Sequence, residues 1–157
     1  MVSVKGKWAL ITGASRGIGY LTALFMAKQG CNLVLHSRSL ENTKKLMDEV
    51  KAFGVDAYCV EAELANHQEV VRMLDDIEAK GTEIDIVFNN AAVQLTYRND
   101  YFKTPIEDLD LSLRVNFIAV TTICYRLLPR MIDRGFGRVI NTTSGIRDQP
   151  EQAGYSA

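Results

Sequence analysis

Short apolar runs alternate with amphipathic stretches along the whole chain. Runs with an apolar centre occupy residues 8–11, 32–36, 56–61, 84–88 and 138–142, and the first has no polar position that alternates with an apolar one. The strands of a parallel sheet have such patterns because helices cover both of its faces. The chain is therefore expected to form five strands that alternate with helices through right-handed crossovers.

Helical periodicity and terminal signals place the helices between these runs. The first helix is expected over residues 17–29, with Gly30 as its C-terminal stop. Ser39 is expected to cap the second helix, and Gly54 is expected to end it. The apolar stripe of the second helix is expected to consist of Leu40, Thr43, Leu46, Met47, Val50 and Phe53.

Two later helices carry signals at their N-termini. Asn66 and Glu69 have the spacing of a capping box. Thr104 and Pro105 open a longer helical region, because threonine can cap a helix and proline fits its first turn. This region is expected to extend to about residue 134, with a bend or break before Pro129.

Length and composition narrow the class of protein. With 157 residues, of which 47% are hydrophobic, the chain suits one domain with a core of its own. The 18 basic and 19 acidic side chains give a formal net charge of −1, which argues against partners such as nucleic acid or an anionic membrane. No apolar run approaches the ~20 residues that span a bilayer, and the first residues lack the layout of a signal peptide.

The cysteines and histidines suggest neither disulfides nor a metal site. Cys31, Cys59 and Cys124 are far apart, and an odd number without a secretion signal predicts free thiols in a reducing compartment, the cytoplasm. His36 and His67 do not have the spacing of metal ligands, so no metal site is expected.

A glycine-rich segment, Thr-Gly-Ala-Ser-Arg-Gly-Ile-Gly, joins the first strand to the first helix at residues 12–19. Gly13 permits a tight turn, Gly17 lets the backbone approach a ligand, and Gly19 lets the helix pack against the strand. The helix then begins with unpaired N–H groups and a partial positive charge, which suit a pyrophosphate. The cofactor-binding residues expected in this segment are Gly13, Ser15, Arg16, Gly17, Ile18 and Gly19.

This order of strand, glycine loop and helix predicts an α/β fold with a three-layer, doubly wound parallel sheet of the Rossmann-like kind. Residues 1–157 are interpreted as a single dinucleotide-binding domain. A merely structural turn is the alternative for the glycines, because turns collect this residue.

The end of the second strand indicates which dinucleotide is preferred. A carboxylate there would bind the adenine ribose 2′-hydroxyl and repel a 2′-phosphate, but the chain has Ser37 and Arg38 instead. Both can donate hydrogen bonds to a phosphate, and Arg16 can approach the same group. NADP(H) is therefore expected in preference to NAD(H), unless both arginines are ordinary surface residues.

Several motifs together resemble the short-chain dehydrogenase/reductase family. They are residues 12–19, Asn89-Asn90-Ala91-Ala92, Asn116, Ser144 and Tyr155, and they extend over essentially the whole chain. The resemblance implies a nicotinamide cofactor and hydride transfer between it and a small-molecule carbonyl or secondary alcohol. It also implies pairing of the long helix between subunits in a homodimer or homotetramer, for which packing within one chain is the alternative.

The resemblance implies a role for each matching residue. Tyr155 would be the general acid and base, and Ser144 would donate a hydrogen bond to the substrate oxygen. Asn116 would hold a helix backbone carbonyl and a water of the proton relay. Asn89 and Ala91 would lie along the adenosine side of the cofactor.

Some positions depart from the family's pattern. Glu63, which Leu64 follows, stands after the third strand where the family usually has aspartate near the adenine. Ala92 replaces a glycine, and the separation of 155 − 144 = 11 residues between Ser144 and Tyr155 is short for the family. The family's lysine, four residues after Tyr155, would be residue 159. The domain is thus expected to be C-terminally incomplete after its fifth strand and inactive on its own.

Two other functions remain open from the sequence. A non-catalytic NADP(H)-binding regulator could use the same fold without turning over a substrate. A Rossmann-like methyltransferase that uses S-adenosylmethionine shares the glycine-rich first loop, but it has no need for Arg38, Ser144 or Tyr155.

Overall fold

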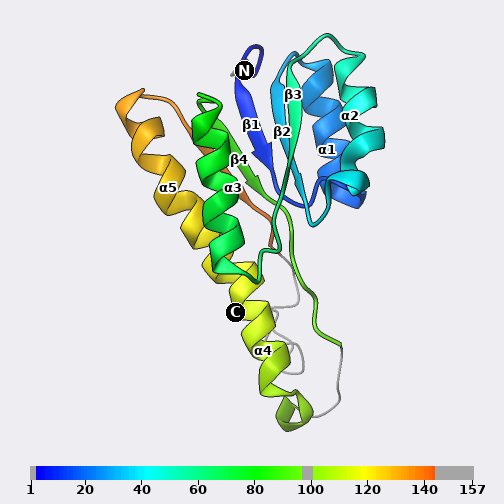
Figure 1. The fold of residues 1–157 in the computed structure, drawn as a ribbon, viewed down its shortest axis with the longest axis vertical. Coiled ribbons are helices and arrows are strands. Elements are labelled where there is room, and N and C mark those ends of the chain that lie inside the picture. The colour runs from blue at the N-terminus through cyan, green and yellow to red at the C-terminus, as the bar shows by residue number, and fades with distance from the viewer. Residues whose placement is uncertain (1–2, 97–100, 144–157) are drawn as a thin grey trace.

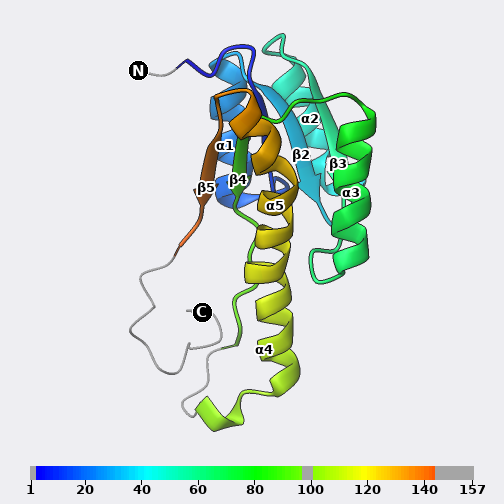
Figure 2. The same cartoon turned by 90° about the vertical axis from the view of Figure 1, so that its left-hand side faces the viewer.

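Five parallel strands form the central layer of the protein, in the order β3–β2–β1–β4–β5 (Figures 1 and 2). The computed structural model describes residues 3–96 and 101–143. The strands are β1 (Trp8–Ile11), β2 (Asn32–Ser37), β3 (Ala57–Glu61), β4 (Ile86–Asn89) and β5 (Arg138–Asn141). The predicted fold class is confirmed, and each predicted strand is present with its bounds shifted by one or two residues at most.

Helices cover both faces of this sheet, as the two views in Figures 1 and 2 show. One face carries α1 (Gly17–Lys28) and α2 (Lys44–Lys51), and the other carries α3 (His67–Ala79) and α5 (Ala119–Asp133). α4 (Ile106–Leu113) extends past the carboxyl edge of the sheet. The shorter elements are the 3-10 turns η1 (Leu40–Thr43) and η2 (Tyr101–Lys103) and the π-helical turn η3 (Arg114–Ile118).

Each face of the sheet has an apolar cluster of its own. Leu10 in β1 points into the cluster under α3 and α5, whereas its neighbours Ala9 and Ile11 point into the cluster under α1 and α2. All three side chains are fully buried. Burial on both faces explains why β1 shows no polar alternation in the sequence.

The second predicted helix is divided into two parts. Thr43, Leu46 and Val50 are buried as expected, but Leu40 and Phe53 are 45% and 42% exposed, so the predicted stripe is wrong at both ends. Leu40 lies in the 3-10 turn η1 and Phe53 lies beyond the last residue of α2. A 3-10 turn has 3.0 residues per turn, so the 3.6-residue period of the stripe does not extend into it.

The helix N-termini agree with the predictions in one case and differ in the other. The Asn66 side chain accepts a hydrogen bond from the backbone N–H of Gln68, as a cap does. α4 begins at Ile106 with Pro105 at the N-cap position, so the prediction that Thr104 caps this helix is wrong. The backbone of Pro105 is not helical, since its ψ angle is 144°.

A break before Pro129 is ruled out, because α5 continues through this residue, whereas a bend there stays a prediction. A proline removes one backbone hydrogen bond of the helix. Leu127 and Met131, on either side of it, are buried in the core cluster and hold the flanking turns in place. The irregularity of the long helix lies instead at the π-helical turn η3.

The continuous helical run Ile106–Asp133 is, by length and composition alone, long and apolar enough to cross a membrane. The apolar pattern of the sequence did not predict this. Val115, Ala119 and Ile123 of the run are nevertheless buried in the core cluster against the sheet. Core helices of globular proteins pass the same test, so the absence of a membrane partner stays a prediction.

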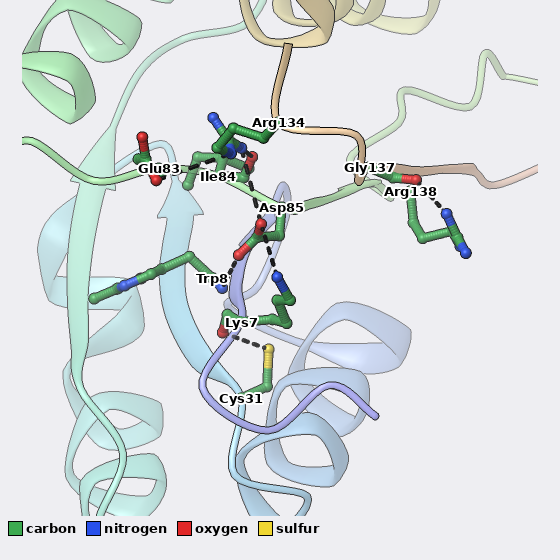
Figure 3. Close-up of polar contacts among 9 residues, drawn as sticks. All are labelled: Lys7, Trp8, Cys31, Glu83, Ile84, Asp85, Arg134, Gly137 and Arg138. Carbon is green, nitrogen blue, oxygen red and sulfur yellow. Dashed lines mark hydrogen bonds and ion pairs between the residues drawn. The ribbon is translucent and has the colours of Figure 1, made fainter. Parts of the chain in front are cut away.

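Asp85 ties the amino edge of the sheet together (Figure 3). The residue is 8% exposed, and its carboxylate accepts a hydrogen bond from the backbone N–H of Trp8 at 3.1 Å and lies 3.5 Å from the ammonium group of Lys7. Arg134, after α5, lies 3.9 Å from the same carboxylate and donates to the backbone carbonyl of Ile84 at 2.6 Å. These contacts fix the amino ends of β1 and β4, and thereby the register of the two strands that lead to the opposite edge.

Candidate functional site

The loops that follow four of the strands meet at the carboxyl edge of the sheet. Residues 12–16 follow β1, residues 38–39 follow β2, residues 62–66 follow β3 and residues 90–96 follow β4. β1 leads to α1 on one face, whereas the chain after β4 leads through α4 to α5 on the opposite face (Figure 1). The connections therefore reverse direction between β1 and β4, and ligands of open α/β sheets bind at such a point.

The loop 12–19 has the backbone geometry that its glycines predict. Gly13 and Gly17 have φ angles of +66° and +58°, which residues with a β-carbon rarely adopt. A β-carbon on Gly19 would lie 2.4 Å from the carbonyl oxygen of Gly13, so only glycine allows α1 to pack this closely. A β-carbon on Gly17 would have no described atom within 4 Å apart from its chain neighbours and its own helix, so this side of the loop is open.

Thr12 and Asn90 hold the glycine loop to the end of β4. The Thr12 hydroxyl oxygen accepts hydrogen bonds from the backbone N–H groups of Asn90 at 2.9 Å and Ala91 at 3.0 Å. The Asn90 side-chain amide donates to the backbone carbonyls of Thr12 at 3.0 Å and Gly13 at 3.2 Å. Neither residue was predicted as a site residue. The signal that could have identified them is their position, because the Thr12 hydroxyl and the Asn90 amide directly follow two adjacent buried strands.

His36 holds the same loop from the other side, at the end of β2. Its imidazole Nδ1 accepts a hydrogen bond from the backbone N–H of Gly13 at 3.3 Å, and its Nε2 lies 3.1 Å from the carbonyl oxygen of Ala62. The His36 carbonyl accepts from the N–H of Ala14 at 2.9 Å. Burial lowers the pKa of His36 below its ordinary value, because the charged form loses its hydration.

The N-terminus of α1 has no side-chain cap. Arg16 occupies the N-cap position with an extended backbone (φ −159°), and its side chain makes no capping hydrogen bond. The first turn of α1 contains no acidic residue. Backbone N–H groups at such a terminus lack partners within the helix and carry a partial positive charge, so the residues present fit the pyrophosphate of a dinucleotide.

The residues expected near a 2′-phosphate differ in their availability. Arg16 and Arg38 are exposed, and neither guanidinium makes a hydrogen bond or ion pair within residues 3–96 and 101–143. Ser37 is 3% exposed, and its hydroxyl donates to the carbonyl of Ser39 at 2.6 Å. Its donor is therefore engaged within its own turn, which leaves the two arginines as the free cationic groups of the predicted set.

Glu63 and Leu64 are held by the loop after β3. One Glu63 carboxylate oxygen accepts the backbone N–H of Ala65 at 3.1 Å, and the Glu63 N–H donates to the Glu69 carboxylate at 2.7 Å. Leu64 is 6% exposed and packs in the core cluster under α3. The Leu64 side chain is therefore part of the hydrophobic core. A contact between residues 63–64 and an adenine stays a prediction.

The model of the short chain dehydrogenase family matches residues 7–157. The chain belongs to the short-chain dehydrogenase family. The resemblance indicated by the sequence motifs is confirmed, and membership of this oxidoreductase family leaves no support for the methyltransferase alternative.

Two curated short-chain dehydrogenases illustrate the relationship. A 3-oxoacyl-(acyl-carrier-protein) reductase of Staphylococcus epidermidis is 32% identical over 154 residues, which cover 96% of this chain and 62% of the relative. A 3-oxoacyl-(acyl-carrier-protein) reductase of Synechocystis sp. is 33% identical over 160 residues, which cover 100% of this chain and 64% of the relative. The chain therefore spans less than two thirds of the length of these relatives.

Solved structures of short-chain dehydrogenases share the fold. A metagenomic short-chain oxidoreductase in complex with NADP matches with a TM-score of 0.90 and 27% identity, over 99% of this chain and 71% of that one. An NAD+-bound xylitol dehydrogenase matches with a TM-score of 0.88 and 27% identity, over 99% of this chain and 60% of that one. The structural neighbours thus include one complex with NADP, which has a 2′-phosphate, and one with NAD+, which lacks it.

Within this short-chain dehydrogenase chain, Asn116 joins the long helix to the loop after β4. It lies in the π-helical turn η3, and its amide donates to the backbone carbonyl of Val93 at 2.9 Å and accepts from the Val93 N–H at 2.9 Å. The carbonyl that it holds therefore belongs to a loop, not to a helix as expected. A π-helical turn changes the direction of a side chain within a helix and often occurs at functional sites.

Asn89 is placed in the sheet rather than at its open edge. It is 4% exposed, and its side-chain amide donates to the Asn141 side chain at 2.9 Å, which links β4 to β5. Ala91 packs against Gly13 so closely that a β-carbon on Gly13 would lie 3.0 Å from the Ala91 Cα. Contacts of Asn89 and Ala91 with adenosine stay predictions, and Ser144 and Tyr155 lie outside the described residues.

Proposed function

We propose that this chain is a single NADP(H)-binding domain of an oxidoreductase that transfers a hydride between the nicotinamide and a small-molecule carbonyl or secondary alcohol. The observation that carries the proposal is the glycine loop between β1 and α1, which leaves an uncapped helix N-terminus where the connections of the sheet reverse. The family supports the same chemistry, since solved relatives are an oxidoreductase in complex with NADP and an NAD+-bound dehydrogenase.

The preference for NADP(H) over NAD(H) is supported by the charges at the end of β2. No carboxylate lies among residues 36–39, and the exposed guanidinium groups of Arg38 and Arg16 are without partners in the described part of the chain. An arginine can bind a phosphate through two parallel hydrogen bonds. A 2′-phosphate would therefore gain charged hydrogen bonds here that a 2′-hydroxyl cannot form.

The protein's own part in the chemistry is to position groups and to move a proton. When bound, NADP(H) supplies or accepts the hydride. Hydride arrival at a carbonyl carbon builds negative charge on oxygen, so we assign Tyr155 to donate a proton to that oxygen and Ser144 to donate a hydrogen bond. Asn116 positions the loop after β4 through its two hydrogen bonds to Val93.

The proposed assembly is a homodimer or homotetramer in the cytoplasm. The run Ile106–Asp133 exposes apolar side chains, and a second copy of the chain is the partner that we propose for them. They include Ile106, Leu113, Phe117, Ile118, Tyr125 and Ile132. Cys31, Cys59 and Cys124 are all free thiols, which supports a reducing compartment. A single-chain mass by light scattering would contradict the assembly.

The cofactor preference is tested by calorimetric titration of NADPH and NADH into the protein and its Arg38→Ala variant. We expect NADPH binding to weaken about tenfold or more, since hydrogen bonds between charged groups contribute roughly 1.5–3 kcal/mol. NADH binding should change little. Ser37 is unsuitable for this test, because a substitution would remove its hydrogen bond to the Ser39 carbonyl.

Arg138→Ala is the matched control, because it removes an exposed arginine from the amino edge of the sheet. It should leave both affinities unchanged. Equal losses for NADPH and NADH in Arg38→Ala would contradict the phosphate contact. Binding of S-adenosylmethionine in place of either dinucleotide would contradict the proposed function itself.

A further inference from the structure

The His36 imidazole has only one tautomer that fits its surroundings. The side chain belongs to a residue that is 1% exposed, so water does not replace missing partners. The carbonyl of Ala62 can only accept a hydrogen bond, which places a proton on Nε2, 3.1 Å away. The backbone N–H of Gly13 can only donate, so Nδ1, at 3.3 Å, must be without a proton. The structure thus requires a neutral ring.

This neutral ring connects three of the five strands, β1, β2 and β3. Nδ1 reaches the loop after β1, the residue itself lies in β2, and Nε2 reaches the segment after β3. The His36 carbonyl binds the N–H of Ala14, so two successive N–H groups of the glycine loop are fixed by one residue. They are the groups that set the left-handed turn at Gly13, where φ is +66°.

We propose that His36 is a pH-sensitive positioning residue for dinucleotide binding, whose neutral ring holds the glycine loop in its phosphate-binding shape and whose protonation releases the loop. The inference rests on the proposed function. A proton on Nδ1 would set two donors, the ring N–H and the Gly13 N–H, against each other across 3.3 Å. The ring or the loop must then move, and the loop carries the start of α1.

The charges around His36 do not offset the preference of its ring for the neutral form. Glu63, from the segment after β3, attracts the proton, whereas burial opposes protonation more strongly and keeps the pKa of His36 below its ordinary value. Gly13, Ala14, Val60 and Ala62 also bond to or pair with His36, and none of these four has a titratable side chain.

The test measures the dissociation constants of NAD+ and NADP+, which are stable in acid, by calorimetry between pH 8 and pH 5.5. NAD+ is the decisive probe, because the 2′-phosphate of NADP+ titrates near pH 6 as other phosphate monoesters do. We expect the NAD+ dissociation constant of the unmodified protein to rise severalfold toward pH 5.5, because a coupling of one pKa unit gives the full tenfold only at a pH below the lowered pKa of His36. In His36→Asn, affinity should be weaker at pH 8 and independent of pH.

The chain offers a matched control in His67, its only other histidine, which is exposed at the start of α3. His67→Asn should keep the pH dependence of the unmodified protein. The result that overturns the inference is an NAD+ affinity that is independent of pH in the unmodified protein, rises as the pH falls, or depends on pH equally in His36→Asn. No dinucleotide binding at pH 8 would instead reject the proposed function.

A second measurement keeps the inference testable if His36→Asn fails to fold. NMR titration of the unmodified protein follows both imidazoles and the amides of Gly13 and Ala14. We expect those amides to shift with the His36 midpoint and not with the His67 midpoint. Amides of Gly13 and Ala14 that stay unchanged while His36 gains its proton would overturn the inference without any ligand.

Discussion

At the scale of single residues, Gly17 and Gly19 stand two positions apart but serve different purposes. Gly17 has a φ of +58° and open space beside it, so alanine there costs backbone strain of about 1–2 kcal/mol. A β-carbon on Gly19 would approach the Gly13 carbonyl oxygen to 2.4 Å and the Asn90 amide nitrogen to 2.6 Å. The contact with Asn90 makes Gly19 part of the link between the glycine loop and β4.

Urea unfolding separates these two purposes. Gly19→Ala is expected to lower the free energy of unfolding more than Gly17→Ala, because backbone atoms cannot move aside for the new methyl group. Gly54→Ala, at a φ of +75° in open space far from the loop, is the control for strain alone. A Gly19→Ala variant as stable as Gly54→Ala would contradict the close packing of α1 on the loop.

The spacing of the glycines was enough to predict their backbone conformation. Residue types did not predict the hydrogen-bond partners of the neighbouring side chains. The positive φ of Gly13 and Gly17 follows from local turn geometry, which the spacing of glycines records. The bond from Asn90 to Thr12 joins residues 78 positions apart, so only the pairing of β1 with β4 creates it. The bond from Ser37 to Ser39 likewise cannot be read from residue types, and a contact between Ser37 and a phosphate stays a prediction.

At the scale of elements, Arg126 joins α5 to α3. Its guanidinium donates to the two carboxylate oxygens of Glu78 at 2.8 Å and 3.0 Å and pairs with Asp75. The side chain is 38% exposed, so water screens the attraction. Arg126→Met is expected to lower the free energy of unfolding only slightly at neutral pH, and less in high salt.

The pH dependence of this pair has a definite sign. Hydrogen bonding to Arg126 lowers the pKa of Glu78 below its ordinary value of 4.5. The pair therefore stabilises the fold above pH 4.5, and the contribution is lost as the pH falls through the lowered pKa. Urea unfolding of both forms at pH 7 and pH 3 should give a difference that shrinks in acid, whereas a difference that grows would contradict the pairing.

The elements themselves were predicted better than their ends and irregularities. Apolar periodicity located the helices because it reflects which face is buried. It did not locate the π-helical turn η3, which depends on the bonds between Asn116 and the distant Val93. It also overestimated the effect of Pro129, since packing of α5 against the core outweighs one missing hydrogen bond.

At the scale of the whole molecule, the alternation of strands and helices predicted both the sheet and the place of the site. Parallel strands bring their carboxyl ends to one edge, so the loops after β1, β2, β3 and β4 gather there whatever their sequences are. Which face each connection covers, and hence where the reversal point lies, became visible only in the folded chain. At the opposite edge, the contacts of Asp85 fix the register of β1 and β4, on which this arrangement depends.

NMR of the 15N-labelled protein during a titration with NADPH tests the proposed phosphate site without any substitution. We expect the backbone amides that shift to concentrate at the carboxyl edge, in residues 12–19, 36–38 and 90–93, with little change around Trp8 and Tyr58 at the amino edge. NADPH that left residues 12–19 unchanged, or shifted only the amino edge, would contradict the proposal that this loop receives the pyrophosphate.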